Sequence, residues 1–326
     1  MIDLTRRPCL VCGGTPSEFL HQTTYPEFRF PGLFTMRRCN GCGLLFNSPR
    51  MDVSDLGKLY GANYYFFRRA TANEFKRIVP TYWRTVGRLD AGRIPATRLM
   101  DIGCGRGYFP AVLRELGWDA RGIEFSPDAA QFARRKFGLD VFAGTAEEYA
   151  SVHGGQFPVV TAIDVIEHVP APDEFIQAAA GLVKPGGQLV IDTPNAAAAN
   201  IAIDGRFWKG FNPFHIFLFT VENLSSLLSR HGFVVGQSFS YNNGRATGFR
   251  SKMMGWMKQT GLSSIAARMY FGMRGACALL DNRISLGAEK AASEIRAKPP
   301  AKFPGDDGPF AATKTGDNFV LIASRL

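Results

Sequence analysis

The stretch LMDIGCGRGYF, residues 99–109, decides the fold more than any other part of the sequence. An apolar run reaches an acid at Asp101, glycines follow at Gly103, Gly105 and Gly107, and a helical pattern begins directly after them. Glycine lets the backbone come close to a ligand because it has no Cβ to clash, and the start of a helix offers unpaired N–H groups. The string therefore predicts a strand, a ligand-binding turn and a helix in succession.

The glycine spacing and the nearby acids indicate the kind of ligand. A dinucleotide-binding turn has Gly-x-Gly-x-x-Gly, whereas Tyr108 fills the third glycine position here and the spacing is Gly-x-Gly-x-Gly. The carboxylate of Asp101 would repel a pyrophosphate but would attract a cationic ligand. Glu124 ends the next predicted strand, about 20 residues further on, where an acid can accept hydrogen bonds from both hydroxyls of a ribose. These features favour S-adenosylmethionine (SAM), which carries a positive sulfur and an ammonium group, over a nicotinamide dinucleotide.

Short apolar runs alternate with helical stretches from residue 97 onward, which is typical of a mainly parallel sheet with crossover helices. The sequence predicts helices that begin near Tyr108, Pro127, Ala146 and Pro172, and a further helix over 221–233. The predicted fold class is α/β, Rossmann-like, with helices on both faces of a mainly parallel seven-stranded sheet. The seven strands are expected at 98–103, 119–125, 140–144, 157–164, 187–193, 233–241 and 317–326.

Composition changes along the chain predict three regions. Residues 1–50 are rich in Cys, Gly, Pro and Phe and are expected to form a small zinc-ribbon-like module. Residues 51–96 place apolar residues three or four apart, which predicts a helical linker or lid. Residues 97–326 form the main domain, with a helical and loop insertion at 246–316 before the last strand.

Four motifs give residues 97–240 a resemblance to a known family. DIGCGRG (101–107), the acid Glu124, AIDVIEHVP (162–170) and LVKPGGQLVIDTPN (182–195) follow one another as they do in class I SAM-dependent methyltransferases. One departure is Thr145, where relatives often carry an aspartate beside the adenine. The resemblance implies that the methionine moiety is held by Asp101, Gly103 and Gly105 with Gly107 shaping the turn, the ribose by Glu124, the adenine by Phe125 and Ala146, and that Asp164 lies near the sulfonium.

Four of the six cysteines form two copies of one turn, CLVCGG (9–14) and CNGCGL (39–44). Each copy places two thiols on a tight loop, and the following glycine allows the positive φ that such a loop needs. We expect one structural Zn²⁺ in a closed all-thiolate site; buried free cysteines or a redox dithiol are the alternatives. The pattern, followed by LLFNSPR, resembles the N-terminal zinc-binding segment of bacterial methyltransferases that modify sugars and other small molecules. The expected ligands are Cys9, Cys12, Cys39 and Cys42.

Two histidines are candidates for the acceptor side of the reaction. A neutral imidazole can remove a proton near pH 7. His168 follows the fourth strand of the predicted core and therefore lies on its catalytic edge, and His215 lies in the aromatic-rich connection WKGFNPFHIFLFT (208–220), which could cover an acceptor. Packing or capping roles are the alternatives for both. A further hypothesis is that three tyrosines form a lid over the cofactor, unless they only pack in a helix: Tyr60, Tyr64 and Tyr65.

Charge and hydropathy limit the partners. The net charge is +10, and it belongs mainly to residues 1–98, which carry 15 Lys and Arg against 7 Asp and Glu, compared with 23 against 21 in residues 99–326. Such a region could attract nucleic acid, an acidic glycan or a phospholipid surface, or simply be solvated. The sequence has no apolar stretch long enough for a transmembrane segment and no export signal, so a cytoplasmic protein is expected. Peripheral membrane contact through residues 251–280 is possible, although a helical cap on the core fits the same pattern.

These observations predict a SAM-dependent methyltransferase with a small-molecule or glycan acceptor, methylated at oxygen. The alternatives are carbon methylation of a nucleotide-linked sugar, methylation of RNA, and a non-enzymatic zinc-ribbon binding module. Methylation of a base amino group is disfavoured, because DVIEHVP stands where such enzymes carry Asn/Asp-Pro-Pro-aromatic.

Overall fold

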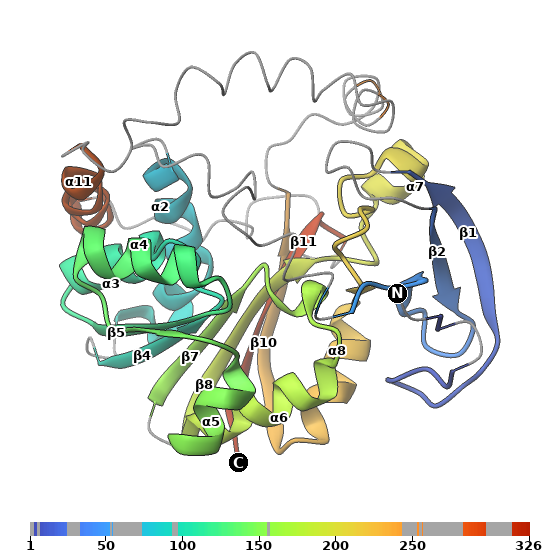
Figure 1. Cartoon of the computed structure of the whole chain (residues 1–326), viewed down its shortest axis with the longest axis horizontal. Helices are drawn as coiled ribbons and strands as arrows, with labels where there is room; N and C mark the ends of the chain where they lie inside the picture. The colour runs from blue at the N-terminus through green and yellow to red at the C-terminus, as the bar shows by residue number, and fades with distance from the viewer. Residues whose placement is uncertain are drawn as a thin grey trace.

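The seven predicted strands form one sheet in the order β10-β11-β8-β7-β4-β5-β6 (Figure 1). The structure is a computed structural model, and it describes residues 3–4, 7–24, 33–52, 54, 74–92, 97–154, 157–242, 253, 256, 283–297 and 315–326. The pairs among β4, β5, β6, β7 and β8 are parallel, whereas β11 is antiparallel to both β8 and β10. The expected α/β, Rossmann-like fold class is confirmed. The strands are β4 (Arg98–Ile102), β5 (Asp119–Glu124), β6 (Val141–Ala143), β7 (Phe157–Ile163), β8 (Val183–Pro194), β10 (Phe233–Tyr241) and β11 (Asn318–Arg325).

The direction of the chain across this sheet reverses beside β4. From β4 the chain continues outward through β5 and β6, and it then returns to add β7 and β8 on the other side of β4. In open parallel sheets the ligand site lies at such a reversal, outside the carboxyl ends of the strands. The residues that follow β4, β5 and β7 are therefore brought to one edge of the molecule.

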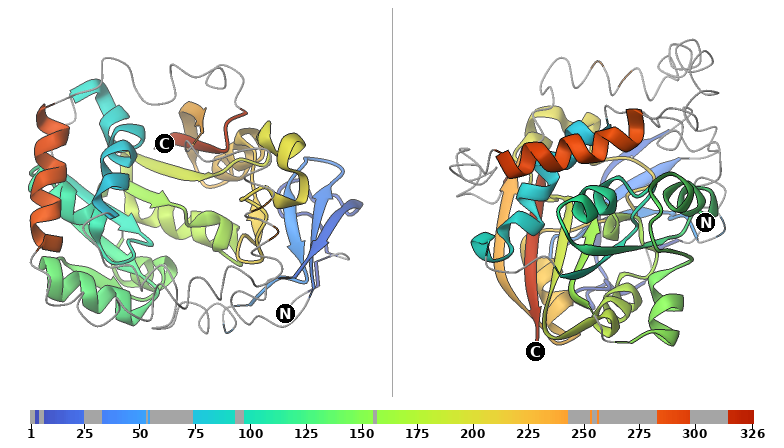
Figure 2. Two further views of the ribbon diagram at one scale, coloured as in Figure 1. Left: turned by 90° about the horizontal axis from the view of Figure 1, so that it is seen from above. Right: turned by 90° about the vertical axis from the view of Figure 1, so that its left-hand side faces the viewer.

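Helices cover both faces of the sheet, as predicted (Figures 1 and 2). Side chains alternate along β4: Leu99 packs with Leu113 on one face, and the next residue, Met100, packs in the same cluster as Ile176 on the other. The first face carries α2 (Phe75–Arg84), η3 (Val86–Gly92), α3 (Tyr108–Glu115), α4 (Pro127–Phe137) and α11 (Arg283–Ala297). The second carries α5 (Ala146–Val152), α6 (Pro172–Leu182) and α8 (Val221–Ser229).

Local sequence explains where the helices next to the glycine turn begin. Helix α4 starts at Pro127 after Ser126, whose side chain accepts a hydrogen bond from the backbone N–H of Ala129. Helix α5 starts after Thr145, which forms a reciprocal capping box with Glu148. Thr145 is the position where relatives often carry an aspartate, and here its hydroxyl serves as a helix cap.

A second, smaller sheet contains the cysteine-rich segment. Its strand order is β1-β2-β3-β9, with β1 (Ser17–Thr23), β2 (Phe34–Cys39) and β3 (Leu45–Ser48) from the N-terminal residues. Its fourth strand, β9 (Phe217–Leu218), comes from the connection that follows β8. In that connection, α7 (Asn200–Asp204) and η5 (Gly205–Phe207) precede β9, and η4 (Ile166–His168) lies beside it in space. Figure 2 places this sheet at the opposite end of the molecule from α11. Residues 1–50 therefore share a sheet with a segment far away in the sequence.

Helix α2 is joined to the carboxyl end of β8. The Arg84 guanidinium lies 3.8 Å from Asp192 and 4.2 Å above the ring of Tyr241, whose hydroxyl donates to Asp192 at 2.7 Å.

Two predictions fall outside the described residues: the lid of Tyr60, Tyr64 and Tyr65, and nearly all of the membrane-contact segment 251–280. Within the described part of the chain, none of the helices has the length and apolar character that a membrane span requires.

Candidate functional site

The glycine turn after β4 has a left-handed backbone at all three glycines. Gly103, Gly105 and Gly107 have φ values of 70°, 57° and 75°. A Cβ at Gly103 would lie 2.5 Å from Val165, and one at Gly107 would lie 2.6 Å from Leu139. A Cβ at Gly105 would meet no described atom within 4 Å. Packing therefore requires two of the glycines, whereas Gly105 faces open space where a ligand can approach the backbone.

Two buried carboxyl groups flank this turn. Glu124 accepts hydrogen bonds from the backbone N–H of Gly105 at 2.7 Å and of Ser126 at 2.8 Å, and Asp101 accepts one from the hydroxyl of Thr161 at 2.6 Å. Burial, together with the nearby Glu124, raises the pKa of Asp101 to about 7 in spite of the Thr161 hydrogen bond. Burial also raises the pKa of Glu124. A positively charged ligand at this turn would stabilise both carboxylates.

The other predicted cofactor residues lie at the ends of the neighbouring strands. Phe125 follows β5 and is 38% exposed, and Ala146 is buried at the first turn of α5. Asp164 follows β7 in a left-handed conformation, φ 53°, which is uncommon for a residue other than glycine and is found often at functional sites. Its side chain is exposed, and its backbone N–H donates to the carbonyl of Asp192 at 2.8 Å.

The two predicted acceptor-side histidines are brought together. Their ring centroids lie 4.8 Å apart at an interplanar angle of 71°. Nδ1 of His168 is 2.9 Å from the carbonyl of Phe214, and Nδ1 of His215 is 2.8 Å from the carbonyl of Gly210. Because a carbonyl only accepts, Nδ1 carries the proton in each neutral ring, and Nε2 is the basic nitrogen. Burial lowers the pKa of His168, although the Phe214 carbonyl and Asp164 oppose this. His168 is therefore neutral at pH 7 and can accept a proton.

Glu167 completes this cluster, and the sequence analysis missed it. Its carboxyl group is 1% exposed; Oε2 accepts from the Thr193 hydroxyl at 2.8 Å, and Oε1 has no hydrogen-bond partner among the described residues. Burial and the neighbouring Asp164 raise its pKa well above the ordinary value. One ligand atom each from Glu167, His168 and His215 lies within 4.8 Å of the others. A carboxylate with two imidazoles can hold a divalent cation. The sequence did carry a signal for Glu167: it stands three residues after Asp164 and directly before His168, so an acid lies next to the candidate histidine.

The aromatic connection before β9 is part of the core. Trp208, Phe211 and Phe214 are at most 9% exposed. Trp208 and Phe211 pack against Met36 and Leu218 of the small sheet, and Phe214 belongs to the main core. That aromatic rings of this connection cover an acceptor stays a prediction. What the connection contributes to the cluster is His215.

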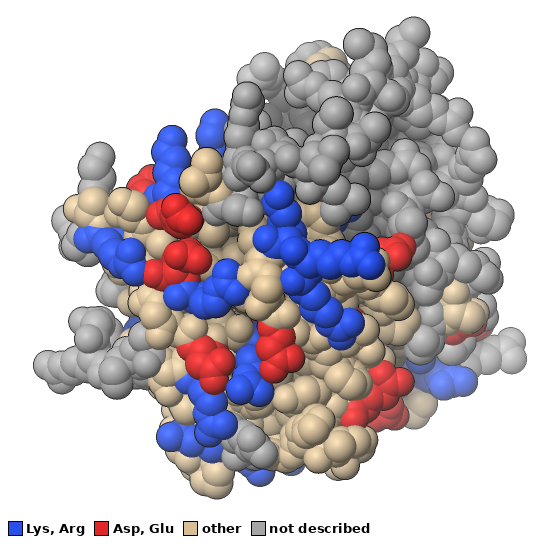
Figure 3. Space-filling model, turned by 60° about the vertical axis from the view of Figure 1, so that its left-hand side comes forward, with Lys and Arg blue, Asp and Glu red and all other residues tan. Residues whose placement is uncertain are grey.

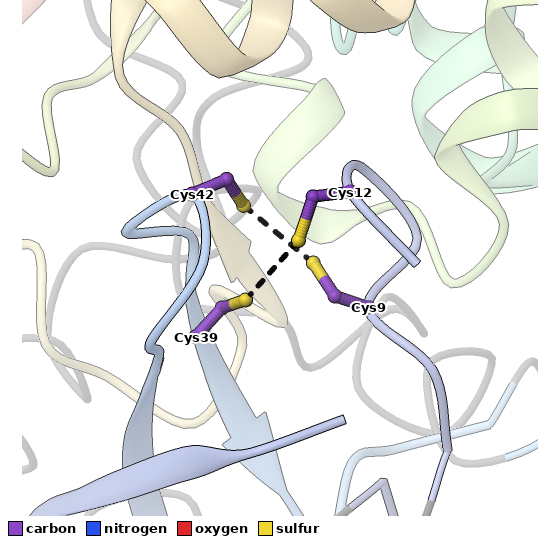
Figure 4. Close-up of side chains that lie close together, drawn as sticks. All are labelled: Cys9, Cys12, Cys39 and Cys42. Atoms are coloured by element: carbon purple, nitrogen blue, oxygen red, sulfur yellow. Dashed lines mark hydrogen bonds between the residues drawn. The ribbon is translucent and has the colours of Figure 1, made fainter. Parts of the chain in front are cut away.

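The four cysteines of the small sheet converge as predicted (Figure 4). The Sγ atoms of Cys9 and Cys42 are 3.6 Å apart, those of Cys12 and Cys39 are 3.5 Å apart, and all four lie within 4.8 Å of one another. Tetrahedral Zn²⁺ with Zn–S bonds of about 2.3 Å requires sulfurs about 3.8 Å apart.

The two cysteine turns also have the same backbone. Gly13 and Gly43 have φ values of 71° and 75°, and their N–H groups donate to the carbonyls of Cys9 and Cys39. The residues present therefore fit a structural zinc ion.

The order of the sheet, the open glycine turn and the two buried acids define an α/β protein that binds a nucleoside-containing cofactor at the reversal point. Residues 67–238, more than half of the chain, match the methyltransferase domain family, and the chain belongs to this family.

Curated relatives are named ubiquinone biosynthesis O-methyltransferase. That of Thiobacillus denitrificans is 37% identical over 31% of this chain and 46% of its own length, and that of Xanthomonas campestris pv. campestris is 30% identical over 42% and 66%. The chain thus spans about half to two thirds of the length of these relatives. A SAM-dependent methyltransferase structure from Thermotoga maritima is 17% identical, covering 80% of this chain and 99% of its own, with a TM-score of 0.47.

Proposed function

We propose that the protein transfers the methyl group of SAM to an oxygen atom of a small-molecule acceptor. The observation that carries the proposal is the turn at Gly105, where a Cβ would meet no described atom within 4 Å and which lies next to the buried carboxyl groups of Asp101 and Glu124. SAM, when bound, supplies a methyl carbon that is activated by a positively charged sulfur. Glu124 would accept hydrogen bonds from the ribose hydroxyls, and Phe125 and Ala146 would contact the adenine.

The acceptor would be activated by the Glu167–His168–His215 cluster. His168 Nε2 would take the hydroxyl proton while the acceptor oxygen bonds to the methyl carbon and the carbon–sulfur bond breaks, which leaves a neutral thioether. The bond from Nδ1 to the Phe214 carbonyl would hold the ring in the required tautomer. The curated relatives are O-methyltransferases by name, and this supports oxygen as the accepting atom.

A divalent cation is a second way to activate the acceptor. It is favoured by the buried Glu167 Oε1, which has no hydrogen-bond partner among the described residues and faces two histidines. A cation held there would lower the pKa of an acceptor hydroxyl directly. The two alternatives differ in their response to a chelator.

Charge on the face of the molecule that carries α3, α4 and α11 supports a small acceptor over nucleic acid there. On the face with α3, α4 and α11, Lys and Arg are interspersed with Asp and Glu (Figure 3). Arg121, for example, lies 3.5 Å from Asp119 and 3.3 Å from Asp140. A surface that binds a polyanion carries clustered charge of one sign instead. A glycan acceptor is a narrower form of the same proposal.

Zinc in the four-cysteine site and a cytoplasmic location belong to the same proposal. Zn²⁺ binds thiolates, and cysteines stay reduced in the cytoplasm. The sulfur distances of 3.5 and 3.6 Å support the first of these.

The proposal is tested by SAM calorimetry together with methyl transfer from labelled SAM. The panel contains hydroxylated aromatic compounds, nucleotide-linked sugars and RNA. We expect micromolar SAM binding and label on a hydroxyl group of a small molecule. His168→Gln should lower turnover by about 10²–10⁴-fold and leave SAM affinity within about twofold. If EDTA abolishes turnover and added Mg²⁺ or Mn²⁺ restores it, a cation is assigned to the cluster. A chain that does not bind SAM, or that labels only RNA, would refute the proposal.

A further inference from the structure

One buried side chain of the cysteine-rich sheet reaches the segment that carries His215. Asn47 lies on β3 and is 2% exposed. Its side-chain Nδ2 donates to two carbonyls, those of Asn212 at 3.0 Å and His215 at 2.8 Å, and its backbone N–H donates to the carbonyl of Ile216 at 2.9 Å. Both side-chain partners are acceptors, so an amide donor is required at this position. Three hydrogen bonds therefore join β3 to residues 212–216.

The same segment is hydrogen-bonded to the acceptor-side cluster. The backbone N–H of Ile216 donates to the carbonyl of Glu167 at 2.7 Å, and the Phe214 carbonyl accepts from Nδ1 of His168 at 2.9 Å. A shift of residues 212–216 would therefore move His215 directly and would change the tautomer partner of His168. Hydrogen bonds through residues 212–216 therefore connect Asn47 with the cluster.

Asn47 is in turn held by the four-cysteine turns. Strand β2 ends at Cys39, the turn with Cys42 follows, and β3 begins at Leu45. Strand β3 pairs with β9 through Leu45–Leu218 and Phe46–Phe217. The first turn is fixed to the main domain as well, because the Arg230 guanidinium at the end of α8 donates to the carbonyls of Leu10 and Val11.

We propose that Asn47 is a positioning residue for methyl transfer, and that the four-cysteine sheet sets the geometry of His168 and His215 through it. The inference rests on the proposed function for its kinetic consequence. In this view the zinc-ribbon-like segment is a structural part of the acceptor side of the active site. The SAM side should be independent of it, because Asp101, Gly105 and Glu124 are held by β4, β5 and β7.

Asn47→Ala tests the inference, with Ser17→Ala as a matched control. Ser17 accepts a side-chain hydrogen bond from Arg37 at 2.9 Å in the same sheet, but it lies on β1, at the opposite edge from β9. Three properties are measured for each variant: SAM affinity by calorimetry, the ring signals of ¹⁵N-histidine in NMR spectra, and kcat and KM with an acceptor of the wild-type protein.

We expect Asn47→Ala to move or broaden the signals of His168 and His215, to leave those of His153 and His231 in place, and to lower kcat at least tenfold. SAM affinity should stay within twofold. Ser17→Ala should change none of these. Asn47→Ser keeps one hydroxyl donor, so its effects on the histidine signals and on kcat should be intermediate. If Asn47→Ala does not fold, Asn47→Ser takes its place in the test.

Unchanged histidine signals in Asn47→Ala would overturn the inference, and so would a kcat loss that Ser17→Ala shares. The NMR signals of the histidines can be measured without any acceptor, so they report on positioning independently of methyl transfer. Failure of the proposed function would be recognised separately, because the wild-type protein would then not bind SAM or transfer its methyl group.

Discussion

The three glycines of the turn after β4 are required for different reasons, although the sequence presents them as equivalent. All three have positive φ, which costs another residue roughly 1–2 kcal/mol. Gly107, like Gly103, has no room for a Cβ, which would lie 2.6 and 2.8 Å from Leu139 and Ala133, whereas Gly105 has open space. Substitution at the two positions should therefore affect different properties.

Gly105→Ala should weaken SAM binding at least tenfold and lower the Tm by only a few degrees, because its methyl group would point into the space proposed for the cofactor. Gly107→Ala should instead cost about 3 kcal/mol or more of folding free energy, from backbone strain and overlap with the side chains of α4 and Leu139. Calorimetry with SAM and thermal unfolding of both variants make the comparison. Equal SAM affinity of Gly105→Ala and wild type would place the cofactor elsewhere.

The positions of single residues were predictable where they depend on local sequence. Asp101, Gly105 and Glu124 lie next to the ends of consecutive strands, so the pattern of strands was enough to bring them together. Asn47 could not be found in this way. Its role depends on pairing between β3 and β9, which are about 170 residues apart, and such long-range pairing leaves no mark on the local sequence.

At the scale of elements, the strands and helices of the large sheet follow the predicted pattern closely, and α4 shows how local sequence can mark both ends of an element. Ser126 and Pro127 mark the start of α4, and Gly138, at φ 62°, marks its end. The small sheet was less predictable. A zinc-ribbon-like module was expected in residues 1–50, but the fourth strand of the sheet, β9, comes from elsewhere in the chain and has only two residues. A strand that short has no periodicity to recognise.

The cysteine turns should bind one zinc ion per chain, and the small sheet should depend on it. With the metal bound, amide hydrogen exchange in β1, β2, β3 and β9 should be slow; removal of the metal by a strong chelator under reducing conditions should accelerate it there more than in β4 and β7. Metal analysis and hydrogen-exchange mass spectrometry measure the two effects. Cys42→Ser should lose the zinc, whereas Cys104→Ser, a cysteine of the glycine turn, should keep it. Full protection of the small sheet in metal-free protein would contradict this prediction.

At the scale of the whole molecule, the arrangement of strands gathers buried carboxyl groups at one edge of the large sheet. Asp101, Glu124, Glu167 and Asp192 are each at most 6% exposed, and the pKa of each is raised, with burial as the main cause. For Asp101 and Asp192 the pKa is raised to about 7. Unfolded, these two groups would titrate near 3.8. Burial of these carboxyl groups is a cost that increases as they ionise.

This charge distribution predicts how stability depends on pH. A carboxyl group with a raised pKa keeps its proton in the folded protein where the unfolded chain has lost it, so its stabilising contribution is complete below about pH 4 and is lost as the pH rises through about 7. The SAM-free protein should therefore lose stability from about pH 4 to about pH 7. A cationic ligand beside Asp101 favours the ionised form, so the increase in Tm caused by SAM should grow over the same range, and SAM binding near pH 6.5 should release protons. Differential scanning fluorimetry with and without SAM, and calorimetry in buffers of different ionisation enthalpy, measure both effects. In Asp101→Asn the pH dependence of the SAM effect should be largely abolished; if it persists unchanged, the proton comes from another group and the cationic part of SAM does not lie beside Asp101.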